Sequence, residues 1–364
     1  MELLDRKTYY RALQSRDARF DGRVFAGVTS TGIYCRPICP ARTPKLANCR
    51  FYVSAAAAQE AGFRPCLRCR PEIAPDLAFW RGTANTVSRA LALIADGALD
   101  DGALDDGALD NRGAGVEALA ERLGVGGRQL RRLFQRHLGA SPVAVAQTRR
   151  VLFAKQLLHD TRLPMAEVAL AAGFGSVRRF NETFRSLFRR PPSALRGALR
   201  RKTGADTSAR DGVTLRLAYR PPYDWPGMLA ALAARAAPGT EWIENGVWHR
   251  GIELAGNEGT VAVAHLPERN SVTVTIRFPE VKALPVLVAK VRRVFDLGAD
   301  IATIGSHLAR DPRLAPLIAR RPGLRAPGDW ECEAPVATVD DRSPPGWRPW
   351  HAYAVQHLRT ADHG

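Results

Sequence analysis

The chain lacks any apolar run long enough to cross a membrane. A transmembrane helix needs about 20 consecutive apolar residues, and no segment of the 364 residues approaches that length. The first residues also lack the basic start and long apolar stretch of a secretory signal peptide. These two absences predict a cytoplasmic protein without a membrane partner.

Acidic residues are scarce relative to basic ones. The 36 Asp and Glu residues face 53 Lys and Arg residues, which gives a formal net charge of +17. Because the guanidinium fork of arginine matches phosphate oxygens and guanine edges, this excess favours a nucleic-acid partner. A basic proteome with an ordinary soluble surface is the alternative. The length predicts two or three domains, and a hydrophobic fraction of 46% suffices for their cores.

Cysteine is also rare, and its placement is uneven. Of six cysteines, Cys49 and Cys332 stand apart and are interpreted as ordinary thiols. The other four form a C-x3-C pair and a C-x2-C pair: Cys35, Cys39, Cys66 and Cys69. In a reducing compartment this spacing predicts four thiolates around Zn²⁺ rather than disulfides. Zinc would staple a domain at 1–78 whose apolar runs are short, and a thiolate in it is also a potential nucleophile.

The helical periodicity of residues 84–200 predicts an all-α domain with two helix-turn-helix motifs. The motifs occupy 115–139 and 163–192, with turns at Gly124 and Gly173 and a connecting helix over 148–160. Apolar residues at helical spacing, including Val177, Phe180 and Phe184, are predicted to be core. The repeat "DGALD", three times over 96–110, is predicted to be an acidic loop because it would bury almost nothing.

Polar faces of the two second helices are candidates for contact with DNA. For any one arginine a phosphate contact or simple solvation competes with base recognition. On the first helix the candidates are Arg128, Gln129, Arg131 and Arg132, and on the second they are Ser176, Arg178, Arg179 and Asn181.

Beyond a polar linker the pattern becomes α+β over 212–330. Alternating apolar residues predict strands, and 3.6-residue periodicity predicts helices. The strands are expected at 213–220, 246–254, 259–266 and 271–278, and the helices at 225–237 and 281–296. The tail at 331–364 has little continuous pattern.

The cysteine motifs resemble a known family. "TGIYCRPICPAR" followed by "FYVSAAAAQEAGFRPCLRCRPE" resembles the zinc domain of the Ada protein, which repairs alkylated DNA in bacteria. The resemblance implies that Cys35 irreversibly accepts a methyl group from a DNA methylphosphotriester while it ligates zinc with the other three cysteines. It also implies DNA contacts by Thr31, Arg42 and Arg64. Pro40 stands where the family has a basic contact.

Two further resemblances cover the rest of the chain. The motif "AGF-x-S-x-x-x-F-x-x-x-F" resembles AraC-type regulators, and residues 213–330 resemble the amino-terminal domain of AlkA-type DNA-3-methyladenine glycosylases. In that family a helix-hairpin-helix domain with the catalytic aspartate would follow, but only a short segment with Asp340 and Asp341 lies before the tail. The expected fold is therefore multidomain α+β with this domain largely missing.

Together these resemblances imply a bacterial protein of the adaptive response to DNA alkylation. Methyl transfer to Cys35, in a single turnover, would convert it into a sequence-specific transcriptional activator. The expected cofactor is Zn²⁺, and the expected partners are double-stranded DNA, at lesions and operators, and RNA polymerase. The alternatives are a non-enzymatic zinc-containing AraC-type regulator and an AlkA-type base-excision glycosylase. The "PCHR" motif of the second Ada methyl acceptor is absent.

Overall fold

The computed structural model describes residues 6–75, 85–95, 97–100, 112–196, 212–331 and 344–361. Cys332, Asp340 and Asp341 lie outside these ranges, as do the linker at 200–211 and most of the acidic repeat. The chain divides into two compact units. The first holds the cysteine-rich and helical parts, and the second holds the α+β part and the tail. Among the described helices, none has the length and apolarity that a membrane crossing requires.

The amino-terminal domain is a small four-stranded sheet with two α-helices. Its strands lie in the order β3-β1-β2-β4, and β4 is parallel to β2. The elements are α1 (Arg6–Ser15), β1 (Phe25–Val28), β2 (Ile33–Cys35), β3 (Cys49–Tyr52), α2 (Ala55–Glu60) and β4 (Arg64–Pro65). Phe25, Tyr34 and Phe63 form its largest buried aromatic group. A core this small fits the expectation that a metal staples the domain.

The helical domain has the two predicted helix-turn-helix motifs. Its helices are α3 (Asn85–Ala95), α4 (Arg112–Arg122), α5 (Gly127–Leu138), α6 (Pro142–Asp160), α7 (Met165–Ala171) and α8 (Val177–Phe188). Gly124 and Gly173 sit in the turns with φ of +69° and +79°, where glycine has no Cβ penalty. The connecting helix α6 begins six residues before the predicted one, because Ser141 caps it and Pro142 suits a first helical turn.

One predicted core residue is wrong. Phe180 and Phe184 are fully buried, but Val177 is 41% exposed. Val177 is the first residue of α8, directly after the cap Ser176, and its side chain therefore precedes the face that packs inward. Helical spacing identified the correct face, but it did not reveal where that face begins.

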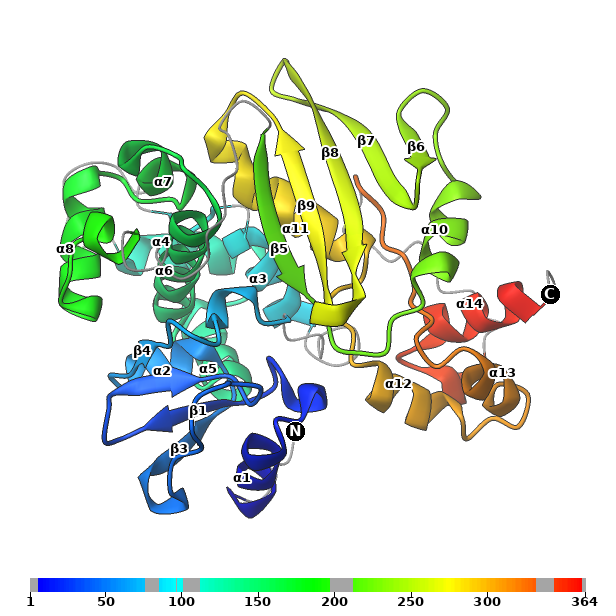
Figure 1. The fold of residues 1–364 in the computed structure, drawn as a ribbon, viewed down its shortest axis with the longest axis horizontal. Helices are drawn as coiled ribbons and strands as arrows, with labels where there is room; N and C mark the ends of the chain where they lie inside the picture. The colour runs from blue at the N-terminus through cyan, green and yellow to red at the C-terminus, as the bar shows by residue number, and fades with distance from the viewer. Residues whose placement is uncertain are drawn as a thin grey trace. The chain divides into compact units, whose positions relative to one another are not determined.

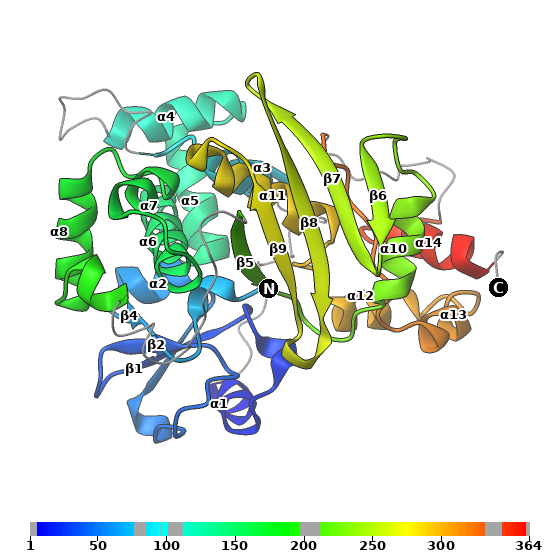
Figure 2. The same cartoon turned by 45° about the horizontal axis from the view of Figure 1, so that its top comes forward.

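The second unit is built on a five-stranded antiparallel sheet in the order β5-β9-β8-β7-β6. Figures 1 and 2 show α11 behind this sheet, and its buried residues Leu287 and Val291 supply that layer of the core. The elements are β5 (Val213–Ala218), α10 (Trp225–Ala233), β6 (Glu241–Glu244), β7 (Val247–Leu254), β8 (Asn257–Leu266), β9 (Ser271–Arg277) and α11 (Leu284–Val294). The sequence analysis missed β6, whose short segment alternates weakly, and it also predicted neither α12 (Ile301–Leu308) nor α13 (Ala315–Arg320).

The end of the chain completes a second hydrophobic cluster in this unit. The elements here are α12 (Ile301–Leu308), α13 (Ala315–Arg320) and α14 (His351–Ala361). Trp347 and Tyr353 are 6% and 3% exposed and pack with Ile304 and Leu314. The Tyr353 hydroxyl donates to Asp296 at 2.6 Å, and Trp347 Nε1 donates to Asp311 at 2.7 Å. The tail is thus an integral part of the second unit.

Substituting Tyr353→Phe should destabilise the second unit. The change removes a buried hydrogen bond to a carboxylate and is expected to lower the free energy of unfolding by about 1–3 kcal/mol. Urea unfolding followed by tryptophan fluorescence measures this, since the tryptophans of the described residues all lie in this unit. The control is Tyr10→Phe, whose hydroxyl bonds Pro44 in the first unit. Coincident curves for Tyr353→Phe and wild type would contradict the role given to the tail.

Candidate metal centre and nucleic-acid interface

The sheet register explains how two distant cysteine pairs meet. Ile33 and Tyr34 of β2 pair with Arg64 and Pro65 of β4, so the residues that follow each strand lie side by side. The backbone N–H of Cys66 donates to the carbonyl of Tyr34 at 3.0 Å, which fixes Cys66 beside Cys35. Local turns then return Cys39 and Cys69 to the same point.

The four sulfurs form one compact cluster. The Sγ atoms of Cys35, Cys39, Cys66 and Cys69 all lie within 4.8 Å of one another. Cys39, Cys66 and Cys69 are 6%, 6% and 7% exposed, whereas Cys35 is only half-buried. Cys35 is therefore the least buried residue of the cluster.

The chemistry of this donor set fits zinc. Crowding of the sulfurs raises the pKa of Cys35 through hydrogen bonds with Cys39 and Cys66, and burial raises the pKa of Cys69. Hydrogen bonds from Cys35 lower the pKa of Cys39 and of Cys66. Without a metal the four thiols share protons, and a bound cation would displace those protons. Tetrahedral sets of four thiolates are typical of structural zinc.

Sequence reasoning missed the part that Arg36 plays at this centre. Arg36 is 2% exposed. Two nitrogens of its guanidinium group pair with the two carboxylate oxygens of the buried Asp21. Arg36 also donates to the carbonyls of Cys69 at 3.0 Å and Arg70 at 3.3 Å, and its backbone N–H donates to Cys69 Sγ at 3.3 Å. Arg36 thus joins the two cysteine loops, although its place between Cys35 and Pro37 was the only signal for this.

The predicted DNA contacts of the amino-terminal domain lie around the cysteine cluster. Thr31 is exposed on the turn between β1 and β2, and Arg64 begins β4. Their segments are adjacent because the N–H of Arg64 donates to the carbonyl of Gly32 at 2.9 Å. Arg42 is exposed just beyond Cys39. The structure therefore brings Thr31 and Arg64 together and leaves Arg42 free to face solvent.

The candidate residues of the two recognition helices are mostly solvent-facing. Arg128, Gln129 and Arg132 are exposed on α5, and Arg131 forms an exposed ion pair with Glu117 at 2.9 Å. These positions lie opposite the buried Leu130 and Phe134. The outward face of α5 is consequently polar and basic.

On α8 the structure separates candidates of different kinds. Ser176 caps the helix, with its hydroxyl accepting from the N–H of Arg179 at 3.1 Å. Arg178 pairs with Glu182 at 2.9 Å on the exposed surface, while Arg179 is exposed and Asn181 is half-buried. Ser176 already has a structural task as a cap, so its hydroxyl is a weaker candidate for base contact.

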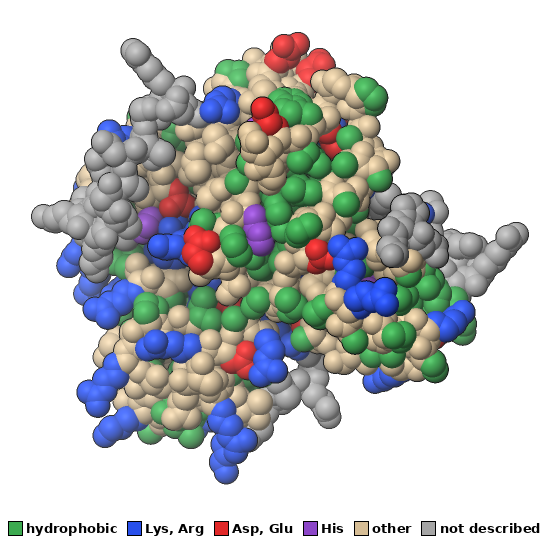
Figure 3. Space-filling view, turned by 45° about the vertical axis from the view of Figure 1, so that its right-hand side comes forward, with side chains coloured by type: hydrophobic (Ala, Val, Ile, Leu, Met, Phe, Trp, Pro, Cys, Tyr) green, Lys and Arg blue, Asp and Glu red, His purple; other side chains and the backbone are tan. Residues whose placement is uncertain are grey.

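Surface charge alone does not single out a binding face. On the side shown in Figure 3, Lys and Arg side chains form several separate groups with Asp and Glu between them. The helix-turn-helix motifs and the cysteine cluster mark the candidate interface instead.

Removing one ligand should remove the metal. Cys39→Ser is expected to lose bound zinc and to destabilise residues 6–75, because three thiolates no longer close a tetrahedral site. Cys49→Ser is the matched control, since Cys49 is 1% exposed in the same domain but outside the cluster. Metal content after purification, measured by plasma mass spectrometry, compares the two. A Cys39→Ser protein with a full equivalent of zinc would contradict the assignment.

Comparisons with known proteins cover all three parts of the chain. Residues 8–72 match the metal binding domain of Ada, residues 119–198 a helix-turn-helix domain, and residues 214–331 the AlkA N-terminal domain. The "Probable bifunctional transcriptional activator/DNA repair enzyme AlkA" of Mycobacterium tuberculosis is 40% identical over 318 residues, which cover 87% of this chain and 61% of that protein. The chain thus spans about three fifths of that relative.

Two relatives from Escherichia coli match individual parts. The bifunctional transcriptional activator/DNA repair enzyme Ada is 33% identical over 138 residues, or 38% of this chain and 34% of that protein. DNA-3-methyladenine glycosylase 2 is 31% identical over 112 residues, or 31% of this chain and 38% of that enzyme. Domain by domain, the chain is therefore similar to the metal binding domain of Ada, a helix-turn-helix domain and the AlkA N-terminal domain.

Proposed function

We propose that this chain repairs DNA methylphosphotriesters by transferring the methyl group to Cys35, and that the methylated form activates transcription. The single observation that carries the proposal is the exposure of Cys35. It is the half-buried member of a four-sulfur cluster whose other members are buried, and Thr31, Arg42 and Arg64 each lie within four residues of one of these cysteines in the sequence. The similarity to Ada over residues 8–72 supports the same assignment.

The proposed step is a single displacement at carbon. A lone pair of Cys35 Sγ forms the new S–C bond while the C–O bond of the methylphosphotriester breaks, and its electron pair stays on the phosphate oxygen as a diester anion. Zn²⁺, when bound, keeps the thiols deprotonated and holds Cys35 as a nucleophilic thiolate at neutral pH. Backbone N–H groups donate to Cys66 Sγ and Cys69 Sγ at 3.3 Å, which stabilises these sulfurs as ligands.

Methylation would also change how the centre interacts with DNA. Cys35 becomes a neutral thioether, so the cluster carries one negative charge fewer. Each removed repulsion with a phosphate is worth about 0.4 kcal/mol at roughly 10 Å in water, and several phosphates sum to about 1–2 kcal/mol before screening. This corresponds to roughly 5- to 30-fold in DNA affinity. A repair event would thereby become a signal for the helix-turn-helix domain.

The remaining partners follow from this proposal. Helices α5 and α8 would enter successive major-groove segments of an operator with Arg128, Gln129, Arg132, Arg178, Arg179 and Asn181 facing the DNA. RNA polymerase would be the target of the activator, and the reducing cytoplasm of a bacterium would keep the thiols available.

We propose further that base excision is absent. Only residues 331–344 separate the AlkA-type domain from η8 (Pro345–Trp347) and α14, and this segment leaves no room for a helix-hairpin-helix domain. Trp347 and Tyr353 pack directly onto α12 and α13. This packing supports a second unit that folds with no further domain between residue 331 and η8.

The methyl acceptor is tested by mass spectrometry. Zinc-loaded protein incubated with methylphosphotriester DNA should gain a single methyl group on the peptide that carries Cys35. Cys35→Ser should gain none, while the control Cys49→Ser should react as wild type does. Zinc-loaded, DNA-binding protein with an unmodified Cys35 would instead identify a non-enzymatic regulator.

The absence of base excision is tested by chromatography of released bases. Alkylated DNA incubated with the full chain should release no free 3-methyladenine above the no-protein rate, because the segment between residue 331 and Pro345 is too short for the domain that carries the catalytic aspartate in the family that this unit resembles. Escherichia coli DNA-3-methyladenine glycosylase 2 is the positive control. Enzymatic release by this chain would overturn the proposal.

A further inference from the structure

The metal-binding and helix-turn-helix domains share a packed interface in the first unit. Ala56 and Ala57 of α2 lie against Ala140, just before α6. Ser54 accepts from the N–H of Ala57 as the cap of α2 and donates its own proton to the carbonyl of Leu138 at 2.6 Å. The two domains thus meet through small side chains that allow close backbone approach.

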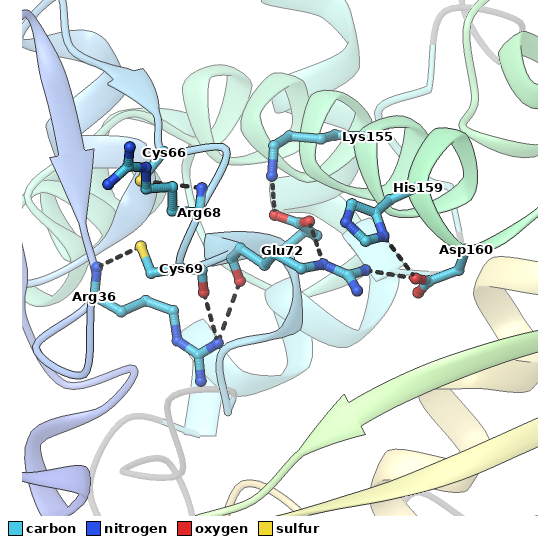
Figure 4. A network of polar contacts seen from close by, with 9 residues as sticks. Arg36, Cys66, Arg68, Cys69, Glu72, Lys155, His159 and Asp160 are labelled. Carbon is cyan, nitrogen blue, oxygen red and sulfur yellow. Dashed lines mark hydrogen bonds and ion pairs between the residues drawn. The ribbon is translucent and has the colours of Figure 1, made fainter. Parts of the chain in front are cut away.

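A buried ionic cluster lies at the other end of α6, as Figure 4 shows. The ammonium group of Lys155 pairs with Glu72, and both side chains are 0% exposed. Glu72 also accepts from Arg70 at 3.1 Å, and Arg70 reaches Asp160 at 2.8 Å. Two positive and two negative groups balance, while His159 Nδ1 lies 3.2 Å from Asp160. The cluster therefore joins two residues of the metal-binding domain to two residues of α6.

Segment 66–73, which includes Arg70 and Glu72 of the ionic cluster, also carries Cys66 and Cys69. Arg70 follows Cys69 directly, and Glu72 lies two residues further on. On the opposite side Arg36 donates to the carbonyls of Cys69 and Arg70, and its backbone N–H donates to Cys69 Sγ. Segment 66–73 is consequently held between the loop of Cys35 and helix α6, so hydrogen bonds and ion pairs run without a break from the residue after Cys35 into the helix-turn-helix domain.

We propose that Lys155 and Asp160 are positioning residues that lock the metal centre to the helix-turn-helix domain, so that both bind DNA as one rigid body. The inference rests on the proposed function, because the rigid link would let methylation of Cys35 raise the affinity of the whole first unit for the operator. A buried ion pair has strict geometry, and a lone buried charge is strongly unfavourable. A rigid link also avoids the ordering cost that a flexible link imposes on the second of two contacts.

The measured quantity is the ratio of operator affinities of methylated and unmethylated full-length protein. The operator is obtained by selection from random DNA with methylated wild-type protein. Wild type should show a gain of roughly 5- to 30-fold. Lys155→Met should still accept the methyl group but show a gain of less than about twofold, because Glu72 then keeps only Arg70 of its own segment as a partner and the fully buried ion pair to α6 is lost.

Two matched variants separate positioning from loss of charge. Lys155→Arg keeps the charge and should retain most of the gain. Arg19→Met removes one positive charge from an exposed pair with Asp17 in the same domain and should leave the gain unchanged. If Lys155→Met retains the full gain while wild type shows it, the locking role is wrong and the proposed function stands. If wild type itself is not methylated or gains no affinity, the proposed function fails.

Two further measurements apply if Lys155→Met does not fold. Asp160→Asn should lower the gain only partly, because the fully buried pair of Lys155 and Glu72 still ties segment 66–73 to α6. Hydrogen exchange of the wild-type chain should show residues 66–75 and α6 opening as one cooperative unit. Faster, independent exchange of residues 66–75 would overturn the locking role.

Discussion

Four sulfur atoms that require one cation form the constraint on which the first unit depends. The parallel pairing of β2 with β4 sets Cys66 beside Cys35, and turns return Cys39 and Cys69 to the same point. A domain with so few buried aromatic residues gains much of its order from this closure. The same closure leaves Cys35 as the least buried of the four cysteines. The residue proposed to accept the methyl group is therefore also one of the candidate zinc ligands that hold the domain together.

The basic excess of the chain serves two distinct purposes. Arg36 and Arg325 are 2% and 1% exposed and bind backbone carbonyls, and Arg325 also stacks its guanidinium 4.4 Å from the ring centre of Tyr223. Exposed arginines such as Arg128 and Arg132 remain for a polyanionic partner. The net charge therefore overstates the number of basic side chains that can contact DNA, because some arginines hold loops in place inside each unit.

The second unit shows how the region similar to the AlkA N-terminal domain packs with the helices that follow it. Its sheet is covered by α11, and the chain end returns Trp347 and Tyr353 to a cluster with α12 and α13. Partnered polar groups accompany this packing, since Asp296 and Asp311 accept from the two aromatic side chains. Burial with satisfied hydrogen bonds favours a stable core, and the side chains of Tyr353 and Trp347 meet that condition.

Periodicity and spacing in the sequence determined the three-part organisation, most helices and strands, and the zinc ligands, because each of these depends on residues close together in the chain. Gly124, Gly173 and the paired cysteines are such local signals. Only the tertiary structure decided that Arg36 is buried, that Val177 is exposed, and that Glu72 meets Lys155. Those facts depend on which distant segments pack together, and no local pattern around an arginine or glutamate records its partner.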